Sequence, residues 1–276
     1  MYIAIPLLAV IGLVLSQVYQ RLLRKRMPAL LKRDWKNQHV YLIQYPRCRT
    51  LPNFSPWSLK LETWFRIAGI PFTNINNEFT KFSAKGQVPF VELNGRQIAD
   101  SNIIIATLRQ EFGKTDLEPT DPKEQSVARA FTALAEEHLT WAMLALRSNS
   151  KNGLAFPASD DGWGRHFGTG LKKSLIKFIM GRANKKLITG RANAQGMGRH
   201  TPDELHAFAK EDLKSISSFL GEKPYFGGDR PTTLDATMFG HLAPLVYIPT
   251  PEGILTKIIT VTYPNLGQFV DRIKEK

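Results

Sequence analysis

Residues 38–118 show a hydrophobic pattern that alternates between strand and helix periods. Residues 40–45 are mostly apolar and rich in β-forming side chains, so they predict a strand. Ser55 and Pro56 then have the residue types with which helices begin. Four apolar side chains follow at helical spacing and predict a buried stripe: Leu61, Trp64, Phe65 and Ala68.

The same segment continues with a second strand and a hairpin. Residues 72–76 predict the strand, and residues 88–93 and 97–99 predict two hairpin arms around an Asn-Gly turn. Ser101 is expected to cap the helix that follows. The strand–helix–strand order favours a parallel pair, to which the hairpin adds an antiparallel edge.

Beyond residue 118 the hydrophobic pattern is helical. Residues 119–124 contain two prolines and predict a linker. The sequence therefore predicts two domains, an α/β domain over residues 38–118 and an all-α domain over residues 125–276.

The N-terminal segment is apolar and then basic. Residues 1–20 have no charged side chain and would form a helix about 30 Å long, roughly the thickness of a bilayer core. A basic tether over residues 21–37 follows where the positive-inside rule places a cytosolic flank. We therefore expect a single-pass transmembrane anchor, with the body of the protein on the cytosolic side. A cleaved secretory signal and a buried helix are the alternatives.

The net charge of +13 is concentrated in residues 21–40 and 171–200, and the rest of the chain is close to neutral. The second block holds eight Lys/Arg and no acidic residue, with apolar residues between them. Nucleic acid is not the expected partner, because aromatic residues are not interleaved with the basic ones for base stacking. An amphipathic helix with a solvated polar face fits the pattern, and so does one that contacts anionic lipid.

The chain has one cysteine, Cys48, and six scattered histidines. An internal disulfide framework is therefore excluded. No metal site is expected, since the histidines lack ligand spacing. Cys48 could act as a nucleophile, but no histidine motif accompanies it, and a lone cysteine is usually an inert small hydrophobe.

Two hydroxyl groups near the first predicted helix could donate a hydrogen bond to a thiolate, which favours the thiolate over the thiol. Ser55 lies at the helix N-terminus, where the macrodipole also favours an anion, although an ordinary N-cap explains it equally. Tyr45 ends the first strand, and packing at the edge of the core is its alternative role.

Two further segments offer groups that bind a peptide. Val88-Pro89 precedes a strand, and a cis peptide bond there would expose the Val88 main chain for strand-like pairing. Asp100 and Ser101 open a helix whose hydroxyl and N–H groups favour a carboxylate, with simple capping as the alternative.

Several stretches together resemble the glutathione transferase fold. They most resemble the failed axon connections proteins and nematode cadmium-responsive proteins, and more distantly the metaxins. The stretches are S-P-W-S-L-K-L-E-T at 55–63, K-G-Q-V-P-F-V-E-L-N-G at 85–95, D-S-N-I-I-I at 100–105, G-M-G-R-H-T-P-D-E-L at 196–205 and K-P-Y-F-G-G-D-R-P-T-T-L-D-A-T-M-F-G-H-L-A at 223–243. The resemblance covers residues 39–246. It implies a thioredoxin-like N-terminal domain followed by a helical glutathione transferase-like C-terminal domain.

The resemblance also implies roles for the candidate residues. Val88-Pro89 would contact the cysteinyl part of glutathione, and Asp100-Ser101 would hold its γ-glutamyl end. Ser55, or alternatively Tyr45, would be the catalytic group that activates the thiolate. Ser55 and Ser58 stand where glutaredoxins carry two cysteines, so dithiol redox chemistry is not available.

Thr232 and Asp235 have the Thr-x-x-Asp spacing of a capping box before an apolar helix. The resemblance implies that this box is a folding element of the helical domain. Its structural role needs no ligand to explain it.

One departure from the family pattern concerns the segment between Asn76 and Gly86, which has nine residues. Glutathione transferases place a helix there that closes one wall of the glutathione site. Nine residues are too few for a packed helix and two loops. We therefore expect a more open site, with Lys81 or Lys85 replacing the lost contacts.

The expected function is that of a membrane-anchored glutathione transferase-like protein in stress, cadmium or xenobiotic response. Glutathione would be the co-substrate and a small electrophile the second substrate. Any metal protection would act through glutathione or partners, because one cysteine cannot sequester a soft metal. The alternative is a non-enzymatic metaxin-like adaptor that uses the fold for protein interaction. A homodimer or protein partners are also implied, on an endomembrane, the lysosome or the mitochondrial outer membrane.

Overall fold

The structure is a computed structural model that describes residues 30–150, 157, 159–248 and 251–275. The expected anchor over residues 1–20 and the first part of the basic tether lie outside the described residues. Within the described part of the chain, no helix combines the length and the apolar character needed to cross a membrane.

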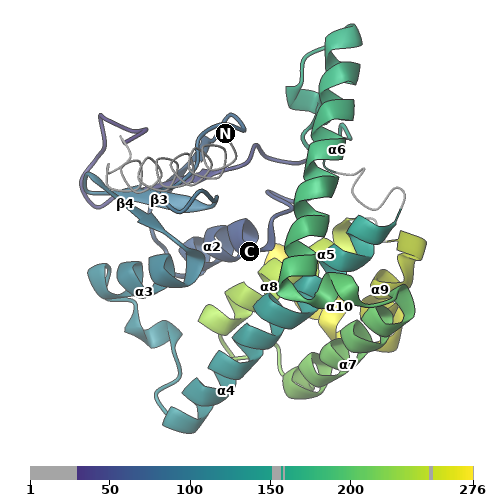
Figure 1. Ribbon diagram of the computed structural model, residues 1–276. Coiled ribbons are helices and arrows are strands. Elements are labelled where there is room, and N and C mark those ends of the chain that lie inside the picture. Colours follow the sequence, from purple (N-terminus) through teal and green to yellow (C-terminus); the bar gives the residue numbers. More distant parts are fainter. Residues whose placement is uncertain (1–29, 151–156, 158, 249–250, 276) are drawn as a thin grey trace, which may run out of the picture.

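The N-terminal domain is a four-stranded sheet with two helices on one face (Figure 1). Its elements are β1 (Val40–Gln44), α2 (Pro56–Ile67), β2 (Phe72–Asn76), β3 (Phe90–Leu93), β4 (Arg96–Ala99) and α3 (Ser101–Glu111). The strand order is β2-β1-β3-β4. Strand β1 pairs parallel with β2 and antiparallel with β3, and β4 extends the sheet antiparallel to β3. This thioredoxin-like arrangement is the one that the sequence predicts.

Helix α2 packs its apolar stripe against the sheet. The predicted stripe is buried along its whole length. Its residues form one core with Leu42 and Val91 of the sheet and Ile104 of α3. Burial of each large apolar side chain stabilises the fold by about 1.5–3 kcal/mol. The helical spacing places these side chains on one side of α2, and that side therefore packs against the sheet.

The opposite face of the sheet is partly covered by the chain that precedes β1. The buried carboxylate of Glu92 accepts hydrogen bonds from the backbone N–H groups of Leu31 and Lys32, at 2.8 and 2.9 Å. The Tyr41 hydroxyl accepts one from the N–H of Lys36 at 3.0 Å. The last part of the basic tether is therefore docked on the sheet by side chains of β1 and β3.

The C-terminal domain is helical. Its elements are α4 (Pro122–Ala133), a π-helical turn (Leu134–Leu139), α5 (Thr140–Asn149), α6 (Gly170–Gln195), α7 (Pro202–Leu220), α8 (Thr233–Tyr247), α9 (Ile254–Lys257), a second π-helical turn (Ile258–Thr262) and α10 (Pro264–Lys274). Short 3-10 turns lie at Thr115–Leu117, Gly164–His166, Met197–Arg199 and Pro251–Gly253. The upper half of α6 projects beyond the body of the molecule (Figure 1).

Helix α8 joins the two domains through close contact with α2. A Cβ atom at Gly240 would lie 2.6 Å from the Pro56 carbonyl oxygen and 2.8 Å from the Lys60 nitrogen, so glycine is required there. The indole N–H of Trp64 donates to the Thr233 hydroxyl at 2.9 Å. At the start of α8, Thr232 and Asp235 form a capping box. The two domains therefore share a packed interface beside the N-terminus of α2.

Candidate functional site

The pairing of the strands brings three distant segments to one end of the sheet. Ile43 of β1 pairs with Phe90 of β3, and Phe90 also pairs with Ala99 of β4. Tyr45 follows β1, Val88-Pro89 precedes β3 and Asp100 follows β4. Tyr45 and Asp100 are more than fifty positions apart in the chain, and yet all of these residues lie along a single edge, which we call the sheet end.

Ser55 is tied to the sheet end through Asn53. Its N–H donates to Asn53 Oδ1 at 2.9 Å, and Asn53 Nδ2 donates to the Tyr45 carbonyl oxygen at 3.0 Å. Ser55 is the N-cap residue of α2, but its side chain forms no capping hydrogen bond. The hydroxyl therefore lies at the positive end of the helix dipole without the role that an ordinary N-cap serine has.

The Val88-Pro89 peptide bond is cis. Pro89 is buried and Val88 half-buried against Ile43 and Phe90. The preceding residue, Gln87, accepts a hydrogen bond from the Arg191 guanidinium of α6 at 3.2 Å. Helix α6 of the second domain therefore contacts the loop beside the proline.

Asp100, and not Ser101, is the N-cap of α3, which corrects the sequence-based expectation. The Asp100 carboxylate accepts hydrogen bonds from the N–H groups of Asn102 and Ile103, at 3.0 and 3.2 Å. Asp100 has a φ of 92°, a left-handed conformation that a residue with a side chain rarely adopts. Such backbone strain concentrates at ligand clamps and active sites. Ser101 is the first residue of the helix and is buried.

A buried polar network fastens the start of α3 to the second domain. The Lys60 ammonium donates to Glu136 Oε1 at 2.6 Å and to Asn102 Oδ1 at 2.7 Å, and Asn102 Nδ2 donates to Glu136 Oε2 at 2.7 Å. His241 Nε2 lies 3.9 Å from Glu136 Oε1. Burial lowers the pKa of His241 to about 3, with Lys60 adding to the effect, so the imidazole is neutral. We call Lys60, Asn102 and Glu136 the interdomain network.

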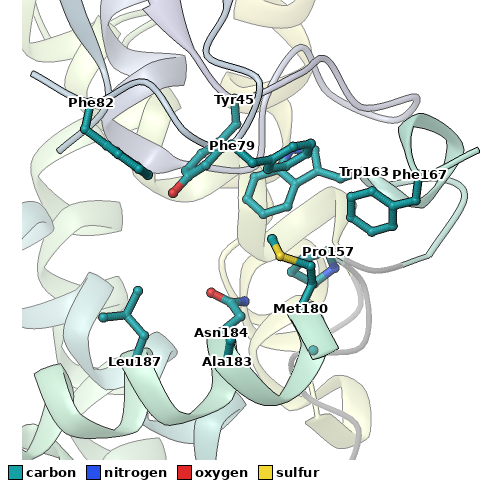
Figure 2. A pocket seen from close by; sticks show the side chains of 11 residues that line it. Tyr45, Phe79, Phe82, Pro157, Trp163, Phe167, Met180, Ala183, Asn184 and Leu187 are labelled. Carbon is teal, nitrogen blue, oxygen red and sulfur yellow. The ribbon is translucent and has the colours of Figure 1, made fainter. Parts of the chain in front are cut away.

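An apolar cavity of ≈ 170 Å³ opens beside Tyr45, between the sheet end and α6. Figure 2 shows the Tyr45 hydroxyl among aromatic rings, with Met180, Asn184 and Leu187 of α6 across the cavity. Burial raises the pKa of Tyr45, and Arg191 opposes that rise. Tyr45 is therefore a neutral phenol that can donate a hydrogen bond at physiological pH.

The walls of this cavity include residues that sequence reasoning missed. Trp163 lies between Tyr45 and Phe54, at ring distances of 4.3 and 4.1 Å, and its indole N–H donates to the Pro46 carbonyl oxygen at 3.1 Å. The Arg49 N–H donates a hydrogen bond to the Asp161 carbonyl oxygen at 2.9 Å. The segment before α6 therefore covers the loop after β1. Its only sequence signal is a pair of aromatic residues among turn-forming ones.

The nine residues after β2 form turns and no helix, as their number predicts. Glu78 and Phe79 have φ values of 53° and 61°, and the Phe79 ring packs 5.3 Å from that of Trp163. Lys81 is bound to Glu78 at 2.6 Å, and Lys85 is exposed. The segment therefore contributes an aromatic side chain to the wall of the site, where glutathione transferases have a helix.

Cys48 lies under this wall and is 7% exposed. Burial raises the pKa of its thiol to about 12, against smaller opposing effects of a Phe54 backbone bond and Arg165. It stays a protonated thiol near neutral pH, whereas nucleophilic attack requires the thiolate. Within the described residues, no group of three or more His, Cys, Asp and Glu side chains could hold a metal ion.

Two family models match the chain. Residues 56–153 match the glutathione S-transferase N-terminal domain, and residues 209–273 match the glutathione S-transferase C-terminal domain. The chain belongs to the glutathione S-transferase-like family. The resemblance noted from the sequence is thereby confirmed, and so is the two-domain fold.

Three curated relatives are similar along most of the chain. Failed axon connections of Drosophila melanogaster is 34% identical over 89% of this chain, which spans 59% of that protein. An isoprene-epoxide–glutathione S-transferase of Rhodococcus sp. is 28% identical over 82% of the chain and 94% of the relative. Metaxin-3 of Danio rerio is 29% identical over 81% of the chain and 71% of the relative.

Solved structures share the fold at low sequence identity. A β-etherase from Sphingobium sp. superposes with a TM-score of 0.56, at 19% identity, over 86% of this chain and 95% of the other. A glutathione S-transferase from Methylobacterium radiotolerans, in complex with glutathione sulfonate, gives a TM-score of 0.52 at 16% identity, over 86% and 91%. At these identities the likeness establishes the fold alone.

Proposed function

We propose that the chain binds glutathione at the sheet end and joins its sulfur to a small apolar electrophile held in the cavity beside Tyr45. The observation that carries the proposal is the strand register, which places Tyr45, Val88 and Asp100-Ser101 on one edge next to the N-terminus of α2. A peptide needs main-chain partners, an anionic partner and a hydrogen-bond donor for its γ-glutamyl end, and a donor for its sulfur. These segments offer each of them.

Each group has a stated task in this proposal. The Val88 main chain pairs with the cysteinyl residue of the ligand. The second oxygen of the Asp100 carboxylate binds the γ-glutamyl ammonium group, since the first accepts the two capping hydrogen bonds of α3, while Ser101 binds the ligand carboxylate. The Ser55 hydroxyl donates to the sulfur, with Tyr45 as the alternative donor. Lowering the thiol pKa by two units requires about 2.7 kcal/mol, which one charge-assisted bond and a helix dipole can supply.

The lining of the cavity and the name of one relative indicate the chemical class of the second substrate. Aromatic and aliphatic side chains line the cavity, so it suits an uncharged compound. The Rhodococcus relative is named for an epoxide and glutathione. In our proposal the thiolate attacks an epoxide carbon, the carbon–oxygen bond opens, and the resulting alkoxide takes a proton from water or Tyr45.

The cellular setting is part of the proposal. Residues 1–20 anchor the chain as a single pass in an endomembrane, in the lysosome or in the mitochondrial outer membrane, with the body in the cytosol. There the conjugation serves a stress, cadmium or xenobiotic response, and homodimers or protein partners form around it. The amino-acid pattern of the N-terminal segment and the relationship to metaxins support this setting.

Replacing Ser55 with alanine is expected to lower conjugation activity about 25-fold at pH 7, because a rise in thiol pKa from about 6.5 to about 8.5 reduces the thiolate fraction from about three quarters to about three per cent. Activity is measured as glutathione consumption with a small epoxide. The thiol pKa is read from the ultraviolet absorbance of the bound thiolate as a function of pH. The midpoint of this titration should rise towards about 8.5 in the variant. Ser126→Ala, at an exposed serine of α4, is the matched control.

The Tyr45→Phe variant separates the two donors. A large loss in Tyr45→Phe together with a normal Ser55→Ala would transfer the role to Tyr45. If the unmodified chain conjugates no electrophile at saturating glutathione, the enzymatic proposal fails and the metaxin-like adaptor takes its place.

A further inference from the structure

The side of α6 that faces away from the cavity exposes an unusual amount of apolar surface. Leu171, Leu175, Phe178 and Ile179 are 92, 60, 58 and 54% exposed. Their spacing of four, three and one residues places them on one side of the helix. We call these four residues the α6 outer face. Exposed apolar patches of this kind mark interaction sites.

Several other residues of α6 already have partners. Met180, Asn184 and Leu187 line the cavity on the opposite side of the helix (Figure 2). Lys173 and Lys177 bind the carboxylate of Asp160, at 2.8 and 2.9 Å. Ala192 is the one residue of this helix that is buried. The α6 outer face lies on the half of the helix that projects from the molecule (Figure 1) and is not needed to close the fold.

Basic side chains surround the α6 outer face. Four are exposed and form no ion pair within the described part of the chain: Lys172, Arg182, Lys185 and Lys186. The Arg182 guanidinium lies 4.6 Å from the centroid of the Phe178 ring, which keeps one positive charge directly beside the apolar stripe. Residues 171–200 contain no acidic side chain that would offset these charges.

We infer that the α6 outer face docks on an anionic lipid surface. Bulky aliphatic and aromatic side chains flanked by lysine and arginine are the composition of helices that lie in the membrane interface. Anionic lipid supplies the negative charge, and the acyl boundary receives the leucines and Phe178. A second copy of this chain does not fit, because symmetric pairing would place the same basic side chains against each other. Lysine is also depleted in the cores of protein interfaces.

The test places an environment-sensitive fluorophore at Ser174→Cys in the full chain. Ser174 is exposed and lies three residues after Leu171 and four before Phe178, whereas the native Cys48 is buried. We expect a blue shift with vesicles that contain phosphatidylserine, and none with phosphatidylcholine alone. Added salt should reverse it. The same label at Ser218→Cys, exposed on α7, should not respond. This readout separates docking of α6 from attachment through residues 1–20, which would not bury the probe.

Charge variants give the matched comparison. Lys172→Glu with Lys186→Glu should weaken the vesicle-induced response at least about thirty-fold, since each basic residue contributes about 1 kcal/mol near anionic lipid. Lys210→Glu with Lys214→Glu makes the same change in net charge at exposed positions on α7 and should leave the response unchanged. The inference is overturned if anionic vesicles leave the probe unshifted, if neutral vesicles shift it equally, or if it shifts without lipid as the chain dimerises. Glutathione conjugation can fail while this result stands.

Discussion

Replacing Glu136 with alanine lowers the free energy of unfolding by about 3–5 kcal/mol, because a buried ammonium group loses its counter-ion. Glu136 and Lys60 are both buried, and their charged atoms are 2.6 Å apart. Burial lowers the pKa of Lys60, and the Glu136 carboxylate opposes that shift. Asn102 would lose one hydrogen bond in addition.

Urea denaturation followed by far-ultraviolet circular dichroism measures this effect. Glu78→Ala is the control, because it breaks an exposed pair with Lys81 of the same 2.6 Å length and should cost no more than about 1 kcal/mol. The double variant Lys60→Met with Glu136→Leu should recover about half of the loss, since a buried pair can be replaced by apolar residues of similar volume. Equal losses in Glu136→Ala and Glu78→Ala would contradict a buried interdomain network.

Replacing Asp235 with alanine is expected to cost about 3–4 kcal/mol. Its buried carboxylate accepts hydrogen bonds from the N–H groups of Phe226, Gly227 and Thr232, at 2.7, 3.2 and 2.9 Å, and from the Thr232 hydroxyl at 2.8 Å. Alanine leaves these donors without a partner inside the protein, where each costs about 1–3 kcal/mol. Part of the cost is recovered by local rearrangement and water.

The control for Asp235 is another aspartate at a helix start. Asp121 caps α4 and accepts one hydrogen bond, from the N–H of Glu124 at 3.0 Å, at an exposed position. Asp121→Ala should therefore cost only about 1 kcal/mol. A lower denaturant midpoint with an unchanged m-value would show that the substitution changes stability and not the compactness of the denatured state. A loss for Asp235→Ala as small as that for Asp121→Ala would show that the capping box is not a main support of α8.

Local periodicity predicted the elements of the N-terminal domain well, because the hydrophobic pattern of each strand and helix is set by residues close in sequence. The stripe of α2 and the bounds of β2 are as the sequence indicates. Errors fall at element ends, where main-chain geometry decides. Strand β1 ends at Gln44 rather than Tyr45, and β3 begins at Phe90 rather than residue 88. The N-cap of α3 is Asp100 and not Ser101. The hydrophobic pattern could not predict this, because it carries no signal for a residue with positive φ.

The surroundings of the site could not be predicted in the same way, because their contacts join residues that are far apart. Lys60 and Glu136 are separated by 76 positions, and Trp163 meets Pro46 across 117. From the sequence alone, Lys60 of α2 would be predicted to be solvated, because its partner Glu136 is distant in the chain. The cavity wall formed by Phe79 and Trp163 also depends on a tertiary contact between two irregular segments.

The central claim is that the sheet end holds a thiol tripeptide, and a glutathione titration of the isotope-labelled full chain, followed by amide resonances, tests it most directly. We expect saturable shifts at Ser55, Val88, Ser101 and Asn102, with a dissociation constant on the order of millimolar or below. Asp100→Ala should weaken the binding, while Asp121→Ala should not. Shifts that stay absent at saturating glutathione, or that gather away from these residues, would contradict the account.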